Sequence, residues 1–366
     1  MAKPYIFNVI NWITQGDLRT VSSNDIKISL IIPTYNRAAS LKRALQSAVH
    51  FDYPPGRYEI IVVDNGSADS TPAVVKDARH NNPGHRLSYV REERLGLHNA
   101  RHAGVWAAQG DILLFTDDDA TFDPGWLRAY AEAFVSHPEM AAAGGPVRAS
   151  WESPPPQWLV EFMGDAKTFG ILSLMEPYDN FHLNGDGIFF GVNMAIRANV
   201  LLEMGGFNPE AFGAVWLGNG ETGLIYKLWD HRMLIGYVPE ALVYHHIPPE
   251  RMTVQYLRDR MANQGACDLY SDFHSALPNI RSMLRRVSGL ILRNYRSWVA
   301  AMLVKNRTDV QSLTVQLESA RTQAQLKYML KVALNKRFQS FVLKKDWIND
   351  LRPMEKRLDT HQHRLS

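Results

Sequence analysis

The sequence predicts an α/β domain built on a mostly parallel β-sheet. Two observations carry this prediction: short apolar runs rich in β-branched residues recur along the first third of the chain, and segments with apolar residues at helical spacing lie between them. Strands that alternate with helices of about 10–15 residues are typical of βαβ units, whose neighbouring strands run parallel. A chain of 366 residues is long enough for roughly two to three domains.

The first four strands and three helices follow from these patterns in chain order. Pro33 closes the first apolar run, and a Ser-Thr-Pro sequence at residues 70–72 is typical of a helix start, because proline is favoured in the first helical turn. The elements expected over this part are a strand at Ile28–Ile32, a helix at Ala39–Val49, a strand at Glu59–Val63, a helix starting near Thr71, a strand at Leu87–Val90, a helix at Asn99–Gln109 and a strand at Asp111–Phe115.

The pattern weakens between Ser150 and Gly191, where a Pro-rich break and a Gly-Asp-Gly sequence predict a mobile loop that forms an acceptor pocket or lid. After Met252 the chain reads as helical, and the first of these helices has an apolar face flanked by arginines. Between these two parts we expect a strand-like run at Phe189–Ile196, a helix at Asn199–Met204, a helix at Glu221–Trp229 and a strand at Ile235–Tyr244.

Polar residues follow three of the predicted strands, at 34–37, at 64–65 and at 117–119. Open α/β sheets bind ligands at the carboxyl ends of their strands, so these residues are expected to share one site. Three consecutive aspartates repel one another, and a hard divalent cation such as Mg²⁺ or Mn²⁺ relieves that repulsion. The residues alone therefore favour a metal site over a solvated turn.

Seven blocks of sequence resemble the family 2 glycosyltransferases, which are inverting enzymes of the GT-A nucleotide-sugar-binding fold. The blocks occur in the family's order over about 225 residues. They are Ser29–Leu45, Glu59–Thr71, Leu95–Gly104, Gly110–Leu127, Gly205–Gly213, Gly220–Leu228 and Tyr237–Thr253.

The resemblance implies a set of residues that bind the nucleotide sugar. The loop after the first strand would cradle the nucleobase and ribose, the carboxylate that ends the second strand would bind the nucleotide, and an arginine would line the pocket. A surface salt bridge is the alternative role for that arginine. The implied residues are Pro33, Thr34, Tyr35, Arg37, Asp64, Arg101, Asp117, Asp118, Gly191 and Asn193.

The resemblance also implies a bound Mn²⁺ or Mg²⁺. Asp117 and Asp119 stand seven and five residues before Pro124, as in the family's Asp-x-Asp metal motif. His245 occupies the position of a third metal ligand in relatives, and packing or surface exposure is its alternative role. Such a cation would neutralise the diphosphate as it leaves.

Inversion needs a base that takes the proton of the acceptor hydroxyl. The family supplies this base from an acidic pair at the start of a helix, and the register places Glu221 there. Both flanking acids of the family pattern are glycines in this chain, Gly220 and Gly223. Glu221 is therefore the one candidate base in this stretch; its alternative role is that of an acid favoured by the helix dipole.

Charge is distributed unevenly along the chain. The net charge is +3, but residues 281–366 hold 18 Lys and Arg against 6 Asp and Glu, which is +12, and the first 280 residues carry −9. The basic end is expected to bind an anionic membrane surface or to form a homo-oligomer, and these two roles stay open. The acidic first part would repel nucleic acid, which is not expected as a partner.

These observations divide the chain into an N-terminal extension at 1–27, a GT-A catalytic domain at 28–265 and a basic amphipathic helical region at 266–366. The catalytic domain has a nucleotide-binding half at 28–125 and an acceptor-binding half at 126–265. The first fifteen residues do not have the pattern of a secretory signal. The single cysteine fits a reducing compartment, so we expect a cytoplasmic protein, peripheral on the cytoplasmic face of the inner membrane.

The resemblance implies a glycosyltransferase of the hexosyltransferase type that adds single sugars, with a UDP-sugar as the favoured donor and a glycan, glycolipid or polysaccharide precursor as acceptor. The chain has no Gln-x-x-Arg-Trp motif and no predicted membrane span, which are features of processive synthases. The alternative is a catalytically impaired nucleotide-sugar-binding or scaffold protein of a glycan-assembly complex.

Overall fold

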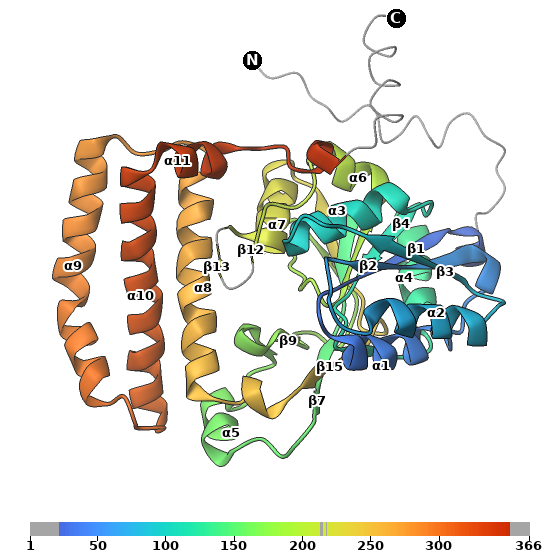
Figure 1. The fold of residues 1–366 in the computed structure, drawn as a ribbon, viewed down its shortest axis with the longest axis horizontal. Coiled ribbons are helices and arrows are strands. Elements are labelled where there is room, and N and C mark those ends of the chain that lie inside the picture. The colour runs from blue at the N-terminus through green and yellow to red at the C-terminus, as the bar shows by residue number, and fades with distance from the viewer. Residues whose placement is uncertain (1–21, 213–214, 217, 352–366) are drawn as a thin grey trace, which may run out of the picture.

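We analysed a computed structural model of the chain, which describes residues 22–212, 215–216 and 218–351. Most of the predicted N-terminal extension lies outside these residues. The described chain forms an α/β domain followed by a group of long helices, with the sheet on one side of Figure 1 and helices α8, α9 and α10 on the other. The predicted α/β class with a C-terminal helical region is confirmed.

The central sheet has eight strands in the order β10-β14-β6-β11-β4-β1-β2-β3. The pairs β1–β2, β2–β3, β1–β4 and β6–β14 are parallel, and the remaining pairs are antiparallel, so the sheet is mixed. The strands are β1 (Ile28–Thr34), β2 (Tyr58–Asp64), β3 (Arg86–Arg91), β4 (Ile112–Phe115), β6 (Met140–Gly144), β10 (His182–Asn184), β11 (Met194–Arg197) and β14 (Leu234–Tyr237).

Both faces of the sheet are covered, which explains why its first strands are apolar throughout. All seven residues of β1 and of β2 are buried. Alternate residues point to opposite faces of a strand, and Leu30 and Ile32 accordingly join one apolar core while Ile31 joins the other. The covering helices are α1 (Ala38–Ala48), α2 (Thr71–Asn81), α3 (Leu97–Ala107), α4 (Trp126–Ser136), α6 (Ala198–Glu203) and α7 (Gly220–Asp230).

A second, five-stranded sheet adjoins the central one, in the order β5-β15-β7-β9-β8. The single strand expected at Ile235–Tyr244 is wrong, because this segment contributes β14 to the central sheet and the start of β15 to the second sheet, with Pro239 between them. The strands are β5 (Ala120–Phe122), β7 (Val147–Trp151), β8 (Thr168–Phe169), β9 (Leu174–Met175) and β15 (Val243–Ile247), and the short helix α5 (Gln157–Met163) follows β7. A separate hairpin pairs β12 (Ala211–Phe212) with β13 (Val215–Trp216).

Four helices form the C-terminal region and share an apolar core of their own: α8 (Val254–Phe273), α9 (Ile280–Leu303), α10 (Val310–Leu334) and α11 (Lys336–Leu343). Helix α10 packs between α8 and α9 (Figure 1). The predicted domain boundary at residue 265 falls inside α8. None of the helices in the described part of the chain combines the length and the apolar character needed to cross a membrane.

After α11 the chain returns to the catalytic domain, and we call residues 345–351 the strap. Within the strap, the backbone N–H of Trp347 donates to the carbonyl of Gly205 at 3.3 Å. The carbonyl of Ile348 accepts from Trp106 Nε1 at 3.0 Å, and Ile348 joins the core beneath α3. The C-terminal region is therefore attached to the sheet domain by α8, by the contact of α10 with α5 and by the strap.

Candidate active site

A cavity of about 380 Å³ opens at the carboxyl ends of β1, β2 and β4, where the sequence predicts the ligand site. Tyr35 at its rim has an exposed ring. The predicted donor-binding residues that line the cavity are Pro33, Thr34, Tyr35, Arg37, Asp117 and Asp118. Asn65, one of the polar residues expected at this edge, also lines the cavity. Lining residues that sequence reasoning did not identify are Leu95, Gly96, Leu97, Ala100 and Glu210.

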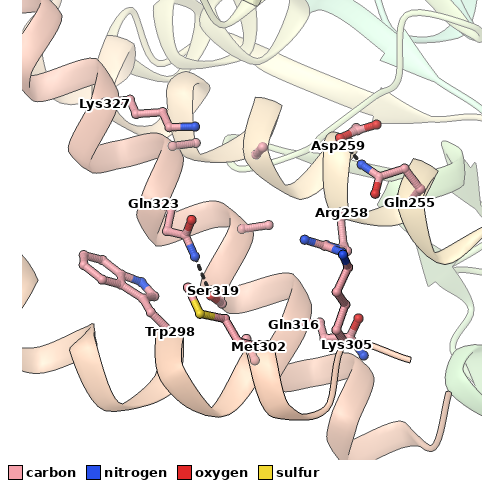
Figure 2. Close-up of a pocket in the computed structure, with 14 residues that line it drawn as sticks. Gln255, Arg258, Asp259, Trp298, Met302, Lys305, Gln316, Ser319, Gln323 and Lys327 are labelled. Carbon is pink, nitrogen blue, oxygen red and sulfur yellow. Dashed lines mark hydrogen bonds between the residues drawn. The ribbon is translucent and has the colours of Figure 1, made fainter. Parts of the chain in front are cut away.

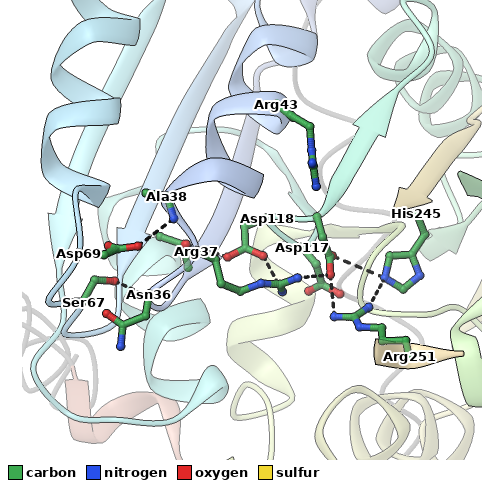
Figure 3. Close-up of polar contacts among 12 residues, drawn as sticks. Asn36, Arg37, Ala38, Arg43, Ser67, Asp69, Asp117, Asp118, His245 and Arg251 are labelled. Carbon is green, nitrogen blue, oxygen red and sulfur yellow. Dashed lines mark hydrogen bonds and ion pairs between the residues drawn. The ribbon is translucent and has the colours of Figure 1, made fainter. Parts of the chain in front are cut away.

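The loop after β1 is fixed to the loop after β2. Asn36 has a positive φ of 53°, a conformation that asparagine tolerates better than most residues. Its backbone N–H donates to Ser67 Oγ at 2.9 Å, and its side-chain oxygen accepts from the backbone of Ala68 at 2.7 Å. Asp69 accepts from the first backbone N–H of α1, as Figure 3 shows. These contacts direct the side chain of Arg37 toward the aspartates.

Asp64 is fully buried and its carboxylate is occupied by protein donors. It accepts from the backbone N–H of Ser67 at 2.7 Å, from Tyr89 Oη at 2.6 Å and from Arg91 Nη1 at 3.3 Å. Asp64 is not among the residues that line the cavity, whereas the next residue, Asn65, is. The structure therefore places Asp64 behind the cavity wall, and its predicted contact with the nucleotide stays a prediction.

The aspartates after β4 form ion pairs with two arginines from distant parts of the chain (Figure 3). Arg37 Nη1 lies 2.8 Å from Asp118 Oδ1, and Arg37 Nη2 lies 2.6 Å from Asp119 Oδ2. Arg251 Nη2 lies 2.7 Å from the same oxygen of Asp119. Thr34 Oγ1 donates to Asp118 at 2.7 Å. The negative charge of Asp118 and Asp119 is thus balanced by two guanidinium groups.

The pKa values of the three aspartates diverge because their neighbours differ. Burial and the negative charge of Asp119 raise the pKa of Asp117. Burial, opposed by Arg37, raises the pKa of Asp118 to about 7. Burial would also raise the pKa of Asp119, yet the charges of Arg251 and Arg37 hold it well below its usual value. Asp119 accordingly has the lowest pKa of the three aspartates.

His245 lies in β15 beside Asp119 rather than after the strand. Its Nδ1 lies 3.0 Å from the carbonyl of Leu172, so Nδ1 carries the proton and Nε2 has a lone pair. Nε2 is 3.5 Å from Asp119 Oδ1 and accepts from Arg251 Nη1 at 2.8 Å. A backbone carbonyl that holds one ring nitrogen is the arrangement found in metal-ligating histidines.

The fit of a metal ion to these residues is partial. Asp119 Oδ1 is buried without a hydrogen-bond partner, and it faces Nε2 of His245, so one oxygen and one nitrogen donor are presented together. Within the described ranges, however, no group of three or more His, Cys, Asp or Glu side chains is placed to hold a metal ion. Asp117 lies on the cavity side, with about a third of its side chain exposed.

Arg101 is the most deeply buried charged side chain of the site, with 2% of its surface exposed. Its Nη1 lies 2.8 Å from Glu210 Oε1 and 3.4 Å from Glu221 Oε2, and its Nη2 lies 3.8 Å from Asp117 Oδ1. The guanidinium also sits over the ring of Phe207, 5.1 Å from the centroid. Arg101 is therefore an internal link between three carboxylates, and it is not the surface salt bridge that sequence reasoning kept as an alternative.

Glu221 lies in the first turn of α7 and forms a carboxyl pair with Glu210. Burial would raise the pKa of Glu221, but the hydrogen bond from Glu210 and the charge of Arg101 lower it to about 2. Burial and the negative charge of Glu221 raise the pKa of Glu210 well above its usual value, against the opposing charge of Arg101. The pair therefore holds one proton on Glu210 and leaves Glu221 ionised.

Gly191 and Asn193 occupy different positions relative to this cluster. A Cβ at Gly191 would lie 2.3 Å from Arg101 Nη2, so the glycine is needed for the arginine to reach the carboxylates. Asn193 is fully buried, and its side chain accepts from Trp126 and Tyr130 and donates to two backbone carbonyls. Its side chain joins α4 to the sheet and is not among those that line the cavity.

Residues 29–204 match the family described as Glycosyl transferase family 2. This region, just under half of the chain, belongs to glycosyl transferase family 2. The match covers β1 to α6, and with them the aspartates and Arg101. Glu210, Glu221 and His245 lie beyond it.

Relatives of this family 2 chain include a glucosyl-dolichyl phosphate glucuronosyltransferase from Haloferax volcanii, 24% identical over 187 residues that make up 50% of this chain and 57% of the relative. A validoxylamine A glucosyltransferase from Streptomyces hygroscopicus subsp. limoneus is 27% identical over 230 residues, 56% of this chain and 48% of the relative. The chain thus spans about half the length of these curated relatives.

Among solved structures, the family 2 chain is similar to a mannosyltransferase from Pyrobaculum calidifontis determined in complex with GDP-Man and Mn²⁺. The TM-score is 0.51 at 18% identity, and the match covers 92% of this chain and 90% of the other. At this level of identity the likeness establishes the fold. The predicted GT-A fold is confirmed.

Proposed function

We propose that this chain is a metal-dependent inverting glycosyltransferase of the hexosyltransferase type. It transfers a single sugar from a nucleotide-sugar donor to a hydroxyl group of a glycan, glycolipid or polysaccharide precursor. The observation that carries the proposal is the position of Arg101, which joins Glu221 to Asp117, and Asp117 lines the cavity. The guanidinium of Arg101 thereby lies close to both the candidate base, Glu221, and a candidate donor-binding carboxylate, Asp117.

Glu221 is the proposed general base. Its side chain keeps 27% of its surface exposed, so an acceptor hydroxyl can reach it, and its lowered pKa keeps it ionised near neutral pH. The base takes the hydroxyl proton while the oxygen attacks the anomeric carbon from the face opposite the departing diphosphate. The bond from sugar to diphosphate breaks as the bond to the acceptor forms, and this displacement inverts the anomeric centre.

The diphosphate is proposed to lie beside Asp117 and Asp119 with a Mn²⁺ or Mg²⁺ ion. The partnerless Asp119 Oδ1 and the lone pair of His245 Nε2 support this proposal, and so does the Mn²⁺ held by the Pyrobaculum mannosyltransferase. A bound cation there would neutralise charge on the leaving diphosphate. Arg37 extends into the same cavity and would contact the phosphates, since guanidinium groups bind phosphate oxygens well.

A UDP-sugar is the proposed donor, on the family resemblance of the loop at Pro33–Arg37. GDP-sugars form the comparison set, because GDP-Man is the donor bound to the Pyrobaculum enzyme. A lipid-linked acceptor is supported by the Haloferax relative, whose name includes dolichyl phosphate. The single cysteine, Cys267, is buried and unpaired, which agrees with the proposed location on the cytoplasmic face of the inner membrane.

Helix α9 is proposed to lie on an anionic membrane surface. The helix holds five arginines and no acidic residue, so an anionic surface complements its charge and a second copy of α9 would repel it. Its inner face packs on α10 and α8, and Trp298 and Met302 line the cavity of about 340 Å³ between them (Figure 2). Apart from Met302, the exposed apolar residues of α9 are Ile280, Leu284, Ile291, Leu292, Tyr295, Val299 and Leu303.

Vesicle flotation of the full chain tests the role of α9. We expect binding to vesicles that contain phosphatidylglycerol, little binding to pure phosphatidylcholine, and loss of binding in Leu284→Glu/Leu292→Glu. The matched control is Leu202→Glu, which places the same charge on an exposed leucine of α6. If the double variant floats like the wild type, or instead converts a dimer to a monomer in ultracentrifugation, the membrane role is wrong and the oligomer is favoured.

Turnover of the donor tests the enzymatic proposal. A thermal-shift screen of UDP-, GDP- and other nucleotide sugars with and without Mn²⁺ identifies the donor, since a ligand that binds the folded state raises Tm. We then expect nucleotide release that requires the metal, stops with EDTA and is lost in Glu221→Gln. If wild type and variant both bind a donor and neither releases nucleotide, the chain is the alternative binding or scaffold protein.

A further inference from the structure

Position 220 lacks the acid that the family pattern places there, and the structure shows why no side chain fits. Gly220 has a φ of +43°, and a Cβ built on it would lie 1.9 Å from Glu210 Oε1 and 2.0 Å from Glu210 Cγ. Real carbon atoms do not approach so closely. The space beside Glu221 that a side chain at position 220 would enter is occupied by the carboxyl arm of Glu210.

The β12–β13 hairpin brings Glu210 to this place. Its two strands pair antiparallel and return the chain, so that the backbone N–H of Gly218 donates to the carbonyl of Glu210 at 3.3 Å. The next turn continues into α7, whose second residue is Glu221. Glu210 thus reaches the start of α7 from the preceding segment, eleven positions earlier in the chain.

Within the described residues, the Glu210 side chain makes its polar contacts with Arg101 and with Glu221, the proposed base. Its carboxyl accepts from Arg101 Nη1 at 2.8 Å and from the backbone N–H of Glu221 at 3.3 Å, and it shares a hydrogen bond with the Glu221 carboxyl. Glu210 is 4% exposed, yet it also lines the cavity. A residue that served only to neutralise Arg101 would not need to contact the backbone and the side chain of the base.

We propose that Glu210 is a positioning residue for Glu221, and that it supplies from the hairpin the acidic partner that Gly220 does not provide. Through Arg101 and the first turn of α7 it fixes the direction of the Glu221 carboxylate. The proton held between the two carboxyls stays on Glu210, which leaves Glu221 free to accept the proton of the acceptor. This inference rests on the proposed function of Glu221 as base.

The test compares Glu210→Ala, Glu210→Gln, Glu210→Asp and Glu221→Gln in the full chain, with kcat, donor KM and the Kd for UDP and Mn²⁺ as readouts. Ala removes the acceptor for Arg101 and the donor to Glu221, whereas Gln keeps the size of the protonated Glu210 and both of these contacts, so Glu210→Gln should stay near wild type. For Glu210→Ala we expect a fall in kcat of about 10-fold, less than the ~10²–10⁴-fold effect of losing a general base. Donor KM and Kd for UDP should stay within about threefold, and Glu210→Asp should recover part of the kcat.

A swap variant, Glu210→Ala/Gly220→Asp, tests the exchange of positions directly. Asp tolerates the left-handed backbone at position 220 better than most residues, and its side chain enters the space that truncation of Glu210 to alanine vacates. We expect the swap variant to have a higher kcat than Glu210→Ala alone. The exposed Glu203→Ala on α6 is the matched control for removal of a carboxylate, and Tm identifies variants that fail to fold.

Two results would overturn the inference. Wild-type kcat in Glu210→Ala, or a fall in kcat matched by an equal loss of UDP affinity and of Tm, would show that Glu210 is not a positioning residue. In both cases the proposed function stands as long as Glu221→Gln remains inactive. If the wild type itself binds donors without turnover, the proposed function fails, and the inference about Glu210 fails with it.

Discussion

Two acidic clusters border the cavity, and they balance their charge differently. Asp118 and Asp119 face two guanidinium groups, from Arg37 and Arg251. Glu210 and Glu221 share a single guanidinium, that of Arg101, which also lies near Asp117. The first cluster thus pairs two carboxyl groups with two cations, while the second balances its carboxyl pair with one cation and one proton, which Glu210 holds.

Burial separates the clusters further. The side chains of Arg37 and Arg251 are 36% and 21% exposed, whereas Arg101 is 2% exposed. Long cationic side chains at a cavity edge can move aside for a ligand, and a fully buried one cannot. We therefore expect Arg37 and Arg251 to move away from the aspartates when the proposed donor and metal ion bind. Arg101 is expected to keep its contacts with Glu210 and Glu221 throughout the reaction.

The largest expected effect comes from the base itself. Glu221→Gln keeps the shape of the side chain but cannot accept the acceptor proton, so kcat should fall by about 10²–10⁴-fold. Binding of UDP with Mn²⁺, measured by calorimetry, should stay near that of the wild type, because the aspartate cluster is intact. A variant that loses donor binding and turnover together would show that the two clusters are not separate in function.

Removal of the buried link should destabilise the fold. Arg101→Gln leaves Glu210 and Glu221 without their cation, and loss of one partner of a buried ion pair costs about 3–5 kcal/mol. Denaturant unfolding measures this change in the free energy of unfolding. Arg148→Gln is the matched control, since Arg148 pairs with Glu176 at the exposed surface and its loss should cost less than about 1 kcal/mol. An equal loss of unfolding free energy in the two variants would contradict the conclusion that Arg101 is a buried link and not a surface ion pair.

Arg251→Gln should have a smaller effect on stability, about 1 kcal/mol, because Arg251 is partly exposed and Arg37 remains paired to Asp119. The same change frees Nε2 of His245 and one contact of Asp119, so the protein should bind Mn²⁺ at least as tightly as before. Manganese titration followed by calorimetry checks this. Weaker Mn²⁺ binding would mean that Arg251 holds the ligands in place and does not compete with the ion.

The pH dependence should be the smallest effect. A carboxylate base is active above its pKa, and the pKa of Glu221 is lowered to about 2, so protonation of the base removes activity only as pH falls toward that value. The profile of kcat/KM should therefore show no limb from Glu221 between about pH 8 and pH 5. The contrary result would be a loss of kcat/KM below pH ~6 in the wild type that is absent from the residual activity of Glu221→Gln. It would show that the pKa of Glu221 is raised, and it would contradict the proposal that Glu210 holds the proton.

The nucleotide-binding half could be predicted closely from sequence for a physical reason. Strands β1 and β2 are buried on both faces, so their residues are continuously apolar, and the polar residues that follow them mark the strand ends. The segment from Ile235 to Tyr244 misled the prediction because apolar residues lie on both sides of Pro239 and Glu240, and apolar character does not say which sheet a strand joins.

The partners of the predicted site residues could not be read from sequence. Glu210 meets Glu221 only because the intervening hairpin returns the chain, and Arg251 reaches Asp119 across two strands of the second sheet. Asn193 matched a family pattern, yet its side chain is used to join α4 to the sheet. One indication of this partner is present in the sequence: the acid that the family pattern places at position 220 is missing. The structure explains the glycine, because a side chain there would clash with Glu210.

The strap at 345–351 constrains how the C-terminal helices can move. A region joined by one linker can pivot in any direction, but α8, the contact of α10 with α5 and the strap attach this one at several places, so it should move together with the α/β domain. The backbone bond from Trp347 to Gly205 and the packing of Ile348 on α3 place one of these attachments on the helix that carries Arg101. A load applied to α9 would therefore be transmitted to that helix through the strap.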